Sequence, residues 1–274
     1  MNQTILITGA SSGIGQATAL YFAKNGWNVV ATMRKFDKHS GLQNCQNVLV
    51  LKLDMEEPET FPSIIEESIE RFGKIDVLLN NAGYGQHGLF EATTPEQIQK
   101  QFSVNLFGTM EITRAILPHF RARQSGTIIT ITSGVGRVTT PLVSVYAASK
   151  FALEGFFESL SFELASQNVL VKIIEPGSIN TNFEQTTKRH FAKDDSLTTY
   201  RSYIKHTDIV FNEIYSGGSS SAIDVAKTIY EAATDRTNQL RYVVGEDLKT
   251  FLKIRNHNED KDYMSTLRNI FAEK

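Results

Sequence analysis

The sequence predicts an α/β fold built on a doubly wound parallel sheet of about seven strands, with helices on both faces. Three observations predict it. Short apolar runs alternate with amphipathic helical patterns along most of the chain, which is typical of parallel sheets. The first apolar run leads directly into a glycine-rich turn and then a helix. The polar motifs follow apolar runs, and ligands bind at the carboxyl ends of parallel strands.

The first strand is expected at residues 3–7, followed by a glycine turn and a helix that stops at Asn25-Gly26. The turn has the spacing Gly9-x3-Gly13-x-Gly15, which differs from the common G-x-G-x-x-G pattern. Glycines let backbone N–H groups approach a pyrophosphate, and the helix N-terminus favours its negative charge. The turn therefore indicates a dinucleotide site, with a plain strand-to-helix turn as the alternative.

The second strand is expected at residues 28–33, and the residues after it bear on the choice of cofactor. An NAD-selective site places an acid about 20 residues after the glycines, where it accepts the ribose hydroxyls. This chain has Met33, Arg34 and Lys35 there, with no acid before Asp37. A guanidinium suits a 2′-phosphate better than a free hydroxyl. Arg34 thus favours NADP(H), and a solvated surface charge is the alternative.

Strands and helices continue to alternate after this point. Further strands are expected at residues 48–53, 75–79, 127–132, 169–174 and 240–244, and helices at 58–72, from Pro95, from Tyr146 to about 167, and at 223–233. The long helix from Pro95 carries Asn105 in its interior. Because asparagine is a mediocre helix former, we expect it to hydrogen-bond a turn or to hold a water.

Helical periodicity fails from Asn182 to Ser221. Aromatic and histidine side chains are scattered among charges there: His190, Phe191, Tyr200, Tyr203, Phe211 and Tyr215. A long irregular stretch inside a compact domain is often a substrate lid, and the alternative is a pair of surface helices packed by the aromatics. Residues 246–274 are expected to form a charged helical extension. Since no repeat or linker divides the chain, we expect residues 1–274 to form one domain.

Ser133 and the segment Tyr146–Lys150 carry the strongest chemical signal. Tyr146 and Lys150 are four residues apart, so a helix projects both from one face. Ser133 follows the strand at 127–132 and lies at its carboxyl end. A phenol, an ammonium and a hydroxyl that meet there can move a proton on and off an oxygen. Taken alone, the Tyr-x3-Lys pattern is also compatible with an ordinary helix face.

Composition excludes several other classes of protein. The chain has 28 basic and 30 acidic residues and no basic block, so nucleic acid is not expected as a partner. Cys45 is the only cysteine, which rules out an internal disulfide and favours the cytoplasm. No apolar run approaches about 18 residues, so no membrane span is expected. The six histidines lack metal-ligand spacing, and no metal site is expected.

Taken together, the motifs resemble those of the short-chain dehydrogenase/reductase family. The resemblance covers roughly residues 3–180 and rests on Thr8-Gly9-x3-Gly13-Ile14-Gly15, Asn80-Asn81-Ala82-Gly83, Asn105, Ser133, Tyr146-x3-Lys150 and Pro176-Gly177. It implies a Rossmann-type fold. The segments around Thr32–Arg34 and Ser149–Gly155 and the long C-terminal extension look most like the branch that reduces steroids and retinoids.

The resemblance also implies a role for each motif. Tyr146 would be the general acid/base, Ser133 would orient the substrate oxygen, Lys150 would bind the nicotinamide ribose, and Asn105 would hold a relay water. The residues implied to contact the cofactor are Gly9, Ser11, Ser12, Gly13, Ile14, Gly15, Arg34, Asp54, Asn81, Gly83, Tyr146, Lys150, Pro176, Gly177, Ile179 and Thr181.

Simple electrostatics supports the pairing of Tyr146 with Lys150. Lowering a phenol from a pKa near 10 to about 7–8 requires about 3–4 kcal/mol. One cation about 4 Å away at an effective dielectric of 20 contributes about 4 kcal/mol. Burial of the phenol opposes this effect.

The leading hypothesis is an NADP(H)-dependent carbonyl reductase or alcohol dehydrogenase that acts as a homodimer or homotetramer. Its small-molecule substrate is expected to be a lipophilic carbonyl or alcohol of some size. An NAD(H)-dependent alcohol dehydrogenase is the alternative cofactor choice. An epimerase or dehydratase of the family's extended branch usually has a Gly-x2-Gly-x2-Gly turn, which this chain lacks. A non-catalytic dinucleotide sensor is the alternative from another class, but such proteins typically lose the Tyr or the Lys.

Overall fold

The computed structural model describes residues 2–36, 41–181, 183, 187, 190–216 and 218–272. Within them, seven parallel strands form the central sheet. These strands are β1 (Thr4–Ile7), β2 (Asn28–Met33), β3 (Val48–Lys52), β4 (Val77–Asn80), β5 (Gly126–Ile131), β6 (Val169–Pro176) and β9 (Arg241–Val244). The helices are α1 (Gly13–Lys24), α2 (Phe61–Phe72), α3 (Pro95–Phe102), α4 (Gly108–Arg123), α5 (Ser144–Ala165), α7 (Arg201–Ser216), α8 (Ala222–Thr234), α9 (Glu246–His257) and α10 (Asp260–Phe271). None of the described helices combines the length and apolarity needed to cross a bilayer.

The strand order β3-β2-β1-β4-β5-β6-β9 confirms the predicted doubly wound sheet. The chain winds outward from β1 to β3, then returns to the other side of β1 with β4. The carboxyl ends of β1 and β4 therefore flank the point where the winding direction reverses. In open parallel sheets this reversal leaves a crevice that binds ligands.

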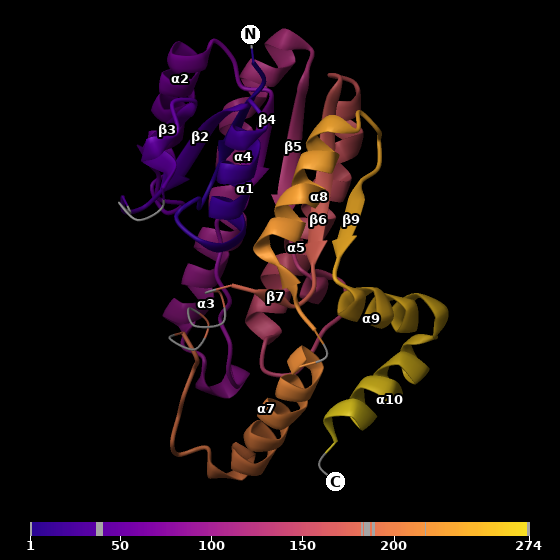
Figure 1. The fold of residues 1–274 in the computed structure, drawn as a ribbon. Helices are drawn as coiled ribbons and strands as arrows, with labels where there is room; N and C mark the ends of the chain where they lie inside the picture. The colour runs from indigo at the N-terminus through magenta and orange to yellow at the C-terminus, as the bar shows by residue number, and fades with distance from the viewer. Residues whose placement is uncertain are drawn as a thin grey trace.

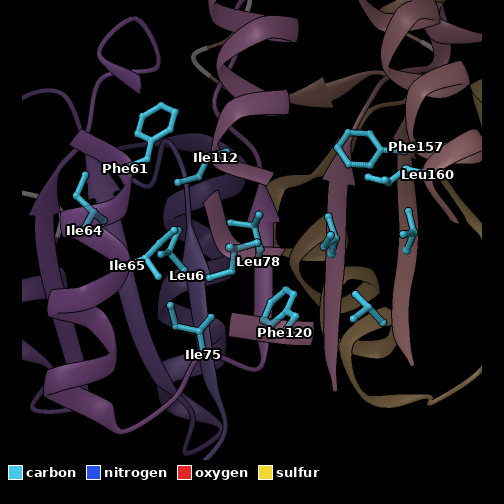
Figure 2. Close-up of a cluster of buried hydrophobic side chains, with 14 of the residues drawn as sticks. Leu6, Phe61, Ile64, Ile65, Ile75, Leu78, Ile112, Phe120, Phe157 and Leu160 are labelled. Carbon is cyan, nitrogen blue, oxygen red and sulfur yellow. The ribbon is translucent and has the colours of Figure 1, made fainter. Parts of the chain in front are cut away.

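Helices cover both faces of the sheet and form a separate core on each. On one face, α2, α4 and α5 pack on Leu6, Leu78 and Ile128, as Figure 2 shows in part. On the other face, α1 and α8 pack on Ile5, Leu79 and neighbouring strand residues. Because the central strands are buried on both faces, they are mostly apolar, without a regular alternation of apolar and polar residues.

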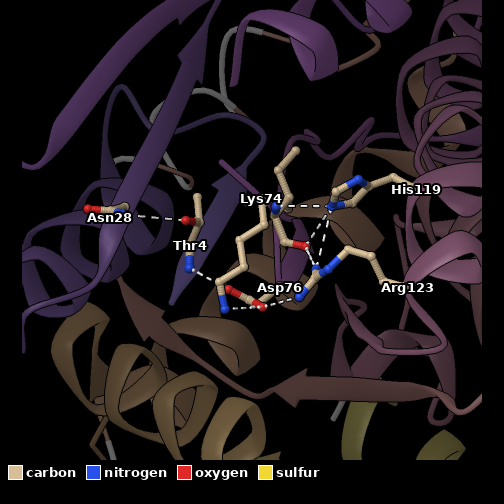
Figure 3. A network of polar contacts seen from close by, with 7 residues as sticks. Thr4, Asn28, Lys74, Asp76, His119 and Arg123 are labelled. Carbon is tan, nitrogen blue, oxygen red and sulfur yellow. Dashed lines mark hydrogen bonds and ion pairs between the residues drawn. The ribbon is translucent and has the colours of Figure 1, made fainter. Parts of the chain in front are cut away.

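A polar network closes the sheet at the amino ends of β1 and β4 (Figure 3). The Asp76 carboxylate accepts hydrogen bonds from the Thr4 backbone N–H at 2.9 Å, from Lys74 Nζ at 3.0 Å and from Arg123 at 2.9 Å. Burial alone would raise the pKa of Asp76, but these donors lower it below its usual value. The network lies at the end of the sheet opposite the glycine turn, so we assign it to stability.

The C-terminal helices lie beyond the carboxyl ends of the strands (Figure 1). α9 packs on Val138 through Leu248 and Leu252, and α10 joins the same cluster through Tyr263 and Leu267. The Phe271 ring meets that of Phe211 in α7 at 5.5 Å. Residues 201–216 form helix α7, so the prediction that helical periodicity fails across 182–221 is wrong for this part of the segment. The buried positions of α7 have helical spacing, as at Thr207 and Val210, but the exposed Ile209 between them obscures the pattern in the sequence. Residues 182, 184–186, 188–189 and 217 lie outside the described residues.

Candidate active site

Tyr146 and Lys150 lie in the first two turns of α5, on the face that meets the sheet. Both side chains are buried, and Lys150 Nζ lies 5.9 Å from the centre of the Tyr146 ring. Lys150 Nζ donates a hydrogen bond of 2.9 Å to the carbonyl oxygen of Ile131, the last residue of β5. The lysine is thus held at the carboxyl edge of the sheet, beside the phenol.

Burial gives Lys150 an unusual titration. Removal of the ammonium from water lowers its pKa from 10.5 to about 8, and the Glu154 carboxylate one helical turn further on opposes the shift. The ammonium is therefore still mostly charged at neutral pH, but it loses its proton far more readily than a surface lysine. A cation that remains beside a phenol stabilises the phenolate and makes proton transfer from Tyr146 easier.

Ser133 is brought to the same place by the short 3₁₀ turn that follows it, Gly134–Gly136. The Ser133 hydroxyl accepts a hydrogen bond of 3.3 Å from the Val135 N–H, and Val135 packs against Tyr146. A Cβ added at Gly136 would lie 3.3 Å from the Lys150 carbonyl oxygen, so this turn rests directly on α5. Because the Ser133 oxygen acts as the acceptor, its own proton is available for another oxygen.

Asn105 differs from the prediction of an ordinary helix interior. It lies in a π-helical turn, Ser103–Phe107, between α3 and α4, and such wide turns are frequent at functional sites. Its amide accepts a hydrogen bond from the Tyr84 N–H at 3.1 Å and donates to the Tyr84 carbonyl at 2.9 Å and to Ser149 Oγ at 3.3 Å. Asn105 thus ties the loop after β4 to the helix of Tyr146.

The glycine turn after β1 is held against the end of β4. The side-chain amide of Asn81 donates to the carbonyls of Thr8 and Gly9 at 2.8 and 2.9 Å, and the Thr8 hydroxyl accepts from two backbone N–H groups after β4. Gly9 has a φ of +71°, and a Cβ there would lie 2.8 Å from the Ala82 Cα. A Cβ at Gly15 would overlap the Gly9 carbonyl. Only glycine fits these two positions.

The start of α1 suits a phosphate. The helix begins at Gly13, within the glycine turn, and the side chain of its N-cap Ser12 makes no capping hydrogen bond. The first backbone N–H groups of the helix are thus left without a cap, and Ser11 and Ile14 are partly exposed beside them. Thr181 lies against Gly13, where an added Cβ would be 3.6 Å from the Thr181 Cβ. These residues fit a dinucleotide pyrophosphate.

The remaining predicted contacts follow the ends of other strands. Arg34 follows β2 and is exposed, and its guanidinium makes no ion pair within the part of the chain that the structure describes. Asp54 follows β3 and accepts from the Glu56 N–H at 3.1 Å. Gly83 lies against the Asn105 amide.

The segment after β6 supplies the last group of predicted contacts. Pro176 ends β6, the Gly177 N–H donates to the Val244 carbonyl at 2.8 Å, and Ile179 begins the short strand β7 (Ile179–Asn180). β7 pairs in parallel with β8 (Ser220–Ser221). This pairing sets the two ends of the 182–221 segment side by side at the mouth of the site.

The sequence of the chain matches the family model for short chain dehydrogenases over residues 3–191. The chain belongs to this family. Like the other members of the short-chain dehydrogenase family, it is an oxidoreductase that uses NAD(P).

Individual members extend the match to nearly the whole chain. Retinol dehydrogenase 8 of Bos taurus is 34% identical over 254 residues, which is 87% of this chain and 80% of that protein. A short-chain dehydrogenase from Streptomyces avermitilis has a TM-score of 0.81 at 28% identity, covering 98% of this chain and 95% of its own. ElxO, solved with NADP bound, has a TM-score of 0.73 at 27% identity, covering 89% of this chain and 98% of its own.

Two rings beside Tyr146 in this short-chain dehydrogenase, and the Tyr84 ring in the same loop as one of them, are not evident from the sequence pattern. The rings of His87 and Phe183 lie 6.1 and 5.9 Å from the Tyr146 ring, and the Tyr84 ring lies 4.8 Å from that of His190. Tyr84 and His87 belong to the loop after Gly83, which lacks periodicity. The only signal in the sequence is that aromatic residues and glycines alternate directly after a motif of the family.

Proposed function

We propose that this protein is an NADP(H)-dependent oxidoreductase that transfers a hydride between the nicotinamide and a lipophilic carbonyl compound or secondary alcohol. The observation that carries the proposal is the meeting of Tyr146, Lys150 and Ser133 beside the glycine turn, at the carboxyl edge of one sheet. The hydride comes from, or returns to, the nicotinamide when the cofactor is bound.

The chain's own residues handle the proton. In the reducing direction, Tyr146 Oη gives its proton to the substrate oxygen as negative charge develops there. Ser133 donates a hydrogen bond to the same oxygen and fixes its position. Lys150 is cationic at neutral pH and stabilises the phenolate that Tyr146 becomes when it loses its proton. Asn105 positions the loop after β4 against the Tyr146 helix through its bonds to Tyr84 and Ser149.

The preference for NADP(H) rests on Arg34. It follows β2, the neighbour of β1, and so lies on the adenosine side of the glycine turn. No acid precedes it between the glycines and the end of β2. Charge-assisted hydrogen bonds to a phosphate contribute about 1.5–3 kcal/mol each, which corresponds to a tenfold to hundredfold preference for NADPH, reduced by salt at this exposed position.

A side-by-side comparison of NADPH and NADH tests the cofactor choice. We expect Arg34→Ala to raise the KM for NADPH at least about tenfold and to leave the KM for NADH nearly unchanged. Lys35→Ala is the matched control, because it removes a charge from the adjacent exposed position. A wild-type preference for NADH, or equal weakening of both cofactors in Arg34→Ala, would assign the protein to the NAD-dependent alternative.

The preference for lipophilic substrates rests on the rings around Tyr146. His87 and Phe183 lie against the phenol, the Tyr84 and His190 rings pack on each other, and such aromatic surface favours large apolar ligands. The relative named for retinol is consistent with this preference. A panel of ketones and aldehydes of rising size, followed by the loss of NADPH absorbance, tests it. Higher kcat/KM for small polar carbonyls would contradict it.

We further propose that the enzyme acts in the cytoplasm as a homodimer or homotetramer. The lone Cys45 is free, which suits a reducing compartment. α5 buries one face on the sheet, yet Phe151 and Phe162 on its other side are 43% and 76% exposed. Exposed aromatic side chains on a central helix favour cover by a second copy of the chain.

A further inference from the structure

We propose that His87 determines substrate specificity by hydrogen-bonding a second oxygen of the substrate, a hydroxyl or carbonyl a few bonds from the reacting carbon. The inference rests on the proposed function, because it names a feature of the substrate that the Tyr146 site reduces or oxidises.

The His87 ring lies beside the ring of Tyr146. Val135, Val143 and Ala147 pack with the phenol in a small apolar cluster. The His87 ring centre lies 6.1 Å from that of Tyr146, and the Phe183 ring lies at 5.9 Å. A substrate oxygen that meets the Tyr146 hydroxyl therefore brings its neighbouring atoms close to the His87 imidazole.

The backbone around His87 is fixed on both sides. The His87 carbonyl accepts from the Ala192 N–H at 2.8 Å, and the Gly88 N–H donates to the Leu142 carbonyl at 2.8 Å. The buried side chain of Gln86 donates to the His190 carbonyl. A Cβ at Gly88, where φ is +121°, would lie 2.6 Å from the Ala192 carbonyl oxygen, so the two segments touch. The backbone that carries the imidazole is thus held by two separate segments, residues 190–192 and Leu142.

The side chain packs tightly as well. A Cβ at Gly85 would lie 3.1 Å from His87 Nε2 and 3.2 Å from Phe183 Cζ, so the imidazole folds back over Gly85 and beside Phe183. The preorganised ring does not have to be ordered when a substrate arrives, which favours selectivity.

The imidazole is neutral and has polar atoms to spare. Burial lowers the pKa of His87 to about 4, so the ring is uncharged at physiological pH. A neutral imidazole offers one N–H donor and one nitrogen acceptor. Among the residues that the structure describes, neither nitrogen has a hydrogen-bond partner, and the side chain is only half-buried. A ligand can therefore reach a polar atom that the described residues leave unused.

An unused polar atom in a largely apolar site discriminates between substrates. A substrate that supplies the partner gains a hydrogen bond, whereas one without it leaves the imidazole desolvated and unpaired. A Leu or Phe at position 87 would serve a plain lipophilic ketone better. The histidine therefore points to hydroxyketones, diketones or the corresponding diols.

A ketone series tests the inference. We would measure kcat/KM with NADPH and with NADH for 2-octanone, 3-hydroxy-2-octanone and 4-hydroxy-2-octanone, in wild type, His87→Leu and His87→Asn. Wild type should favour at least one hydroxyketone over 2-octanone by about tenfold. His87→Leu should abolish this preference by lowering kcat/KM for the hydroxyketones about tenfold more than for 2-octanone, and His87→Asn, which keeps a donor and an acceptor, should restore part of it. Phe183→Leu is the control, because it alters packing on Tyr146 and should change all three ketones alike.

The outcomes separate this inference from the proposed function. If the wild type does not discriminate, or if His87→Leu lowers all three ketones by one factor, His87 is only a packing residue and the inference is wrong. If the wild type reduces no ketone with either cofactor, the proposed function fails and the inference fails with it. Cofactor binding by each variant, followed by fluorescence, shows that it is folded.

Discussion

Replacing Lys150 with methionine should abolish most of the activity yet stabilise the protein at neutral pH. Lys150 is buried, and the described residues show one hydrogen bond for it, to the Ile131 carbonyl, with the Glu154 carboxylate only partly offsetting the cost of burial. Its pKa falls from 10.5 to about 8 on folding, so the native state carries a charge that the unfolded state would solvate better. Methionine has a similar length and no charge.

The size of the effect follows from the pKa. The difference of 10.5 − 8 corresponds to about 3 kcal/mol at 1.36 kcal/mol for each pKa unit. Loss of the hydrogen bond to the Ile131 carbonyl offsets about 1–2 kcal/mol of it. We therefore expect Lys150→Met to raise the free energy of unfolding by about 1–2 kcal/mol at pH 7, which is a few degrees in Tm.

The effect must depend on pH in a defined direction. Between the folded pKa of about 8 and the unfolded value of 10.5, the unfolded wild type binds more protons than the native state. Wild-type stability therefore rises with pH through this window relative to the variant, by about 1.36 kcal/mol per pH unit. The advantage of methionine shrinks from about pH 8, is lost at about pH 9–9.5, and is reversed at higher pH. Urea unfolding at pH 7 and pH 9.5 measures both points.

A second buried lysine supplies the control. Lys172 is fully buried, but it donates to the Asp235 carboxylate and to Tyr242 Oη. Burial alone would raise the pKa of Asp235, but the bond from Lys172 helps to lower it to about 2. Lys172→Met should thus destabilise by about 2–4 kcal/mol. If Lys150→Met destabilises at pH 7, or if its effect is the same at both pH values, the reasoning about Lys150 is refuted.

Four further predictions concern catalysis, the glycine turn and assembly. Tyr146→Phe should lower kcat by about 10²–10⁴ at least while NADPH still binds; near-normal turnover would reject the tyrosine as the acid. Gly9→Ala should weaken cofactor binding and destabilise the fold by about 2 kcal/mol or more, because the new Cβ meets the Ala82 backbone; unchanged NADPH titration and melting would show that the turn can shift. Residues 183–215 should be cleaved faster by protease without ligands than with cofactor and substrate together, and equal rates would indicate fixed packing. Light scattering at micromolar concentration should give the mass of a dimer or tetramer. The mass of a monomer would contradict the proposal that a second copy of the chain covers Phe151 and Phe162.

The central sheet could be predicted from the sequence because its strands are apolar on both faces and are separated by regular helices. The expected strand bounds agree with β1, β2, β5 and β9 to within one residue. Asn105 shows where this reasoning stops. A π-helical turn depends on the contacts that Tyr84 and Ser149 make across the fold, and those contacts have no local pattern.

The loop after β4 was equally hard to predict, for a related reason. The positions of Tyr84 and His87 are set by bonds to Gln101, Leu142 and Ala192, which are far away in the chain. Propensity and periodicity describe neighbours along the sequence, so they identify the motif that ends at Gly83 and give no information about the ring that comes to lie beside Tyr146. The cofactor side of the site is encoded locally, whereas the substrate side is encoded by the fold.

The contact between Phe211 and Phe271 has a practical consequence for handling the protein. The last helix packs on α7, which borders the open end of the sheet, whereas β1 starts at the opposite end (Figure 1). A polypeptide fused after α10 would pull on the neighbours of the substrate opening, and a tag before β1 would not. Substrate profiles measured with C-terminal fusions should therefore be compared with N-terminal ones, and gene fusions that keep activity should join partners through the amino end.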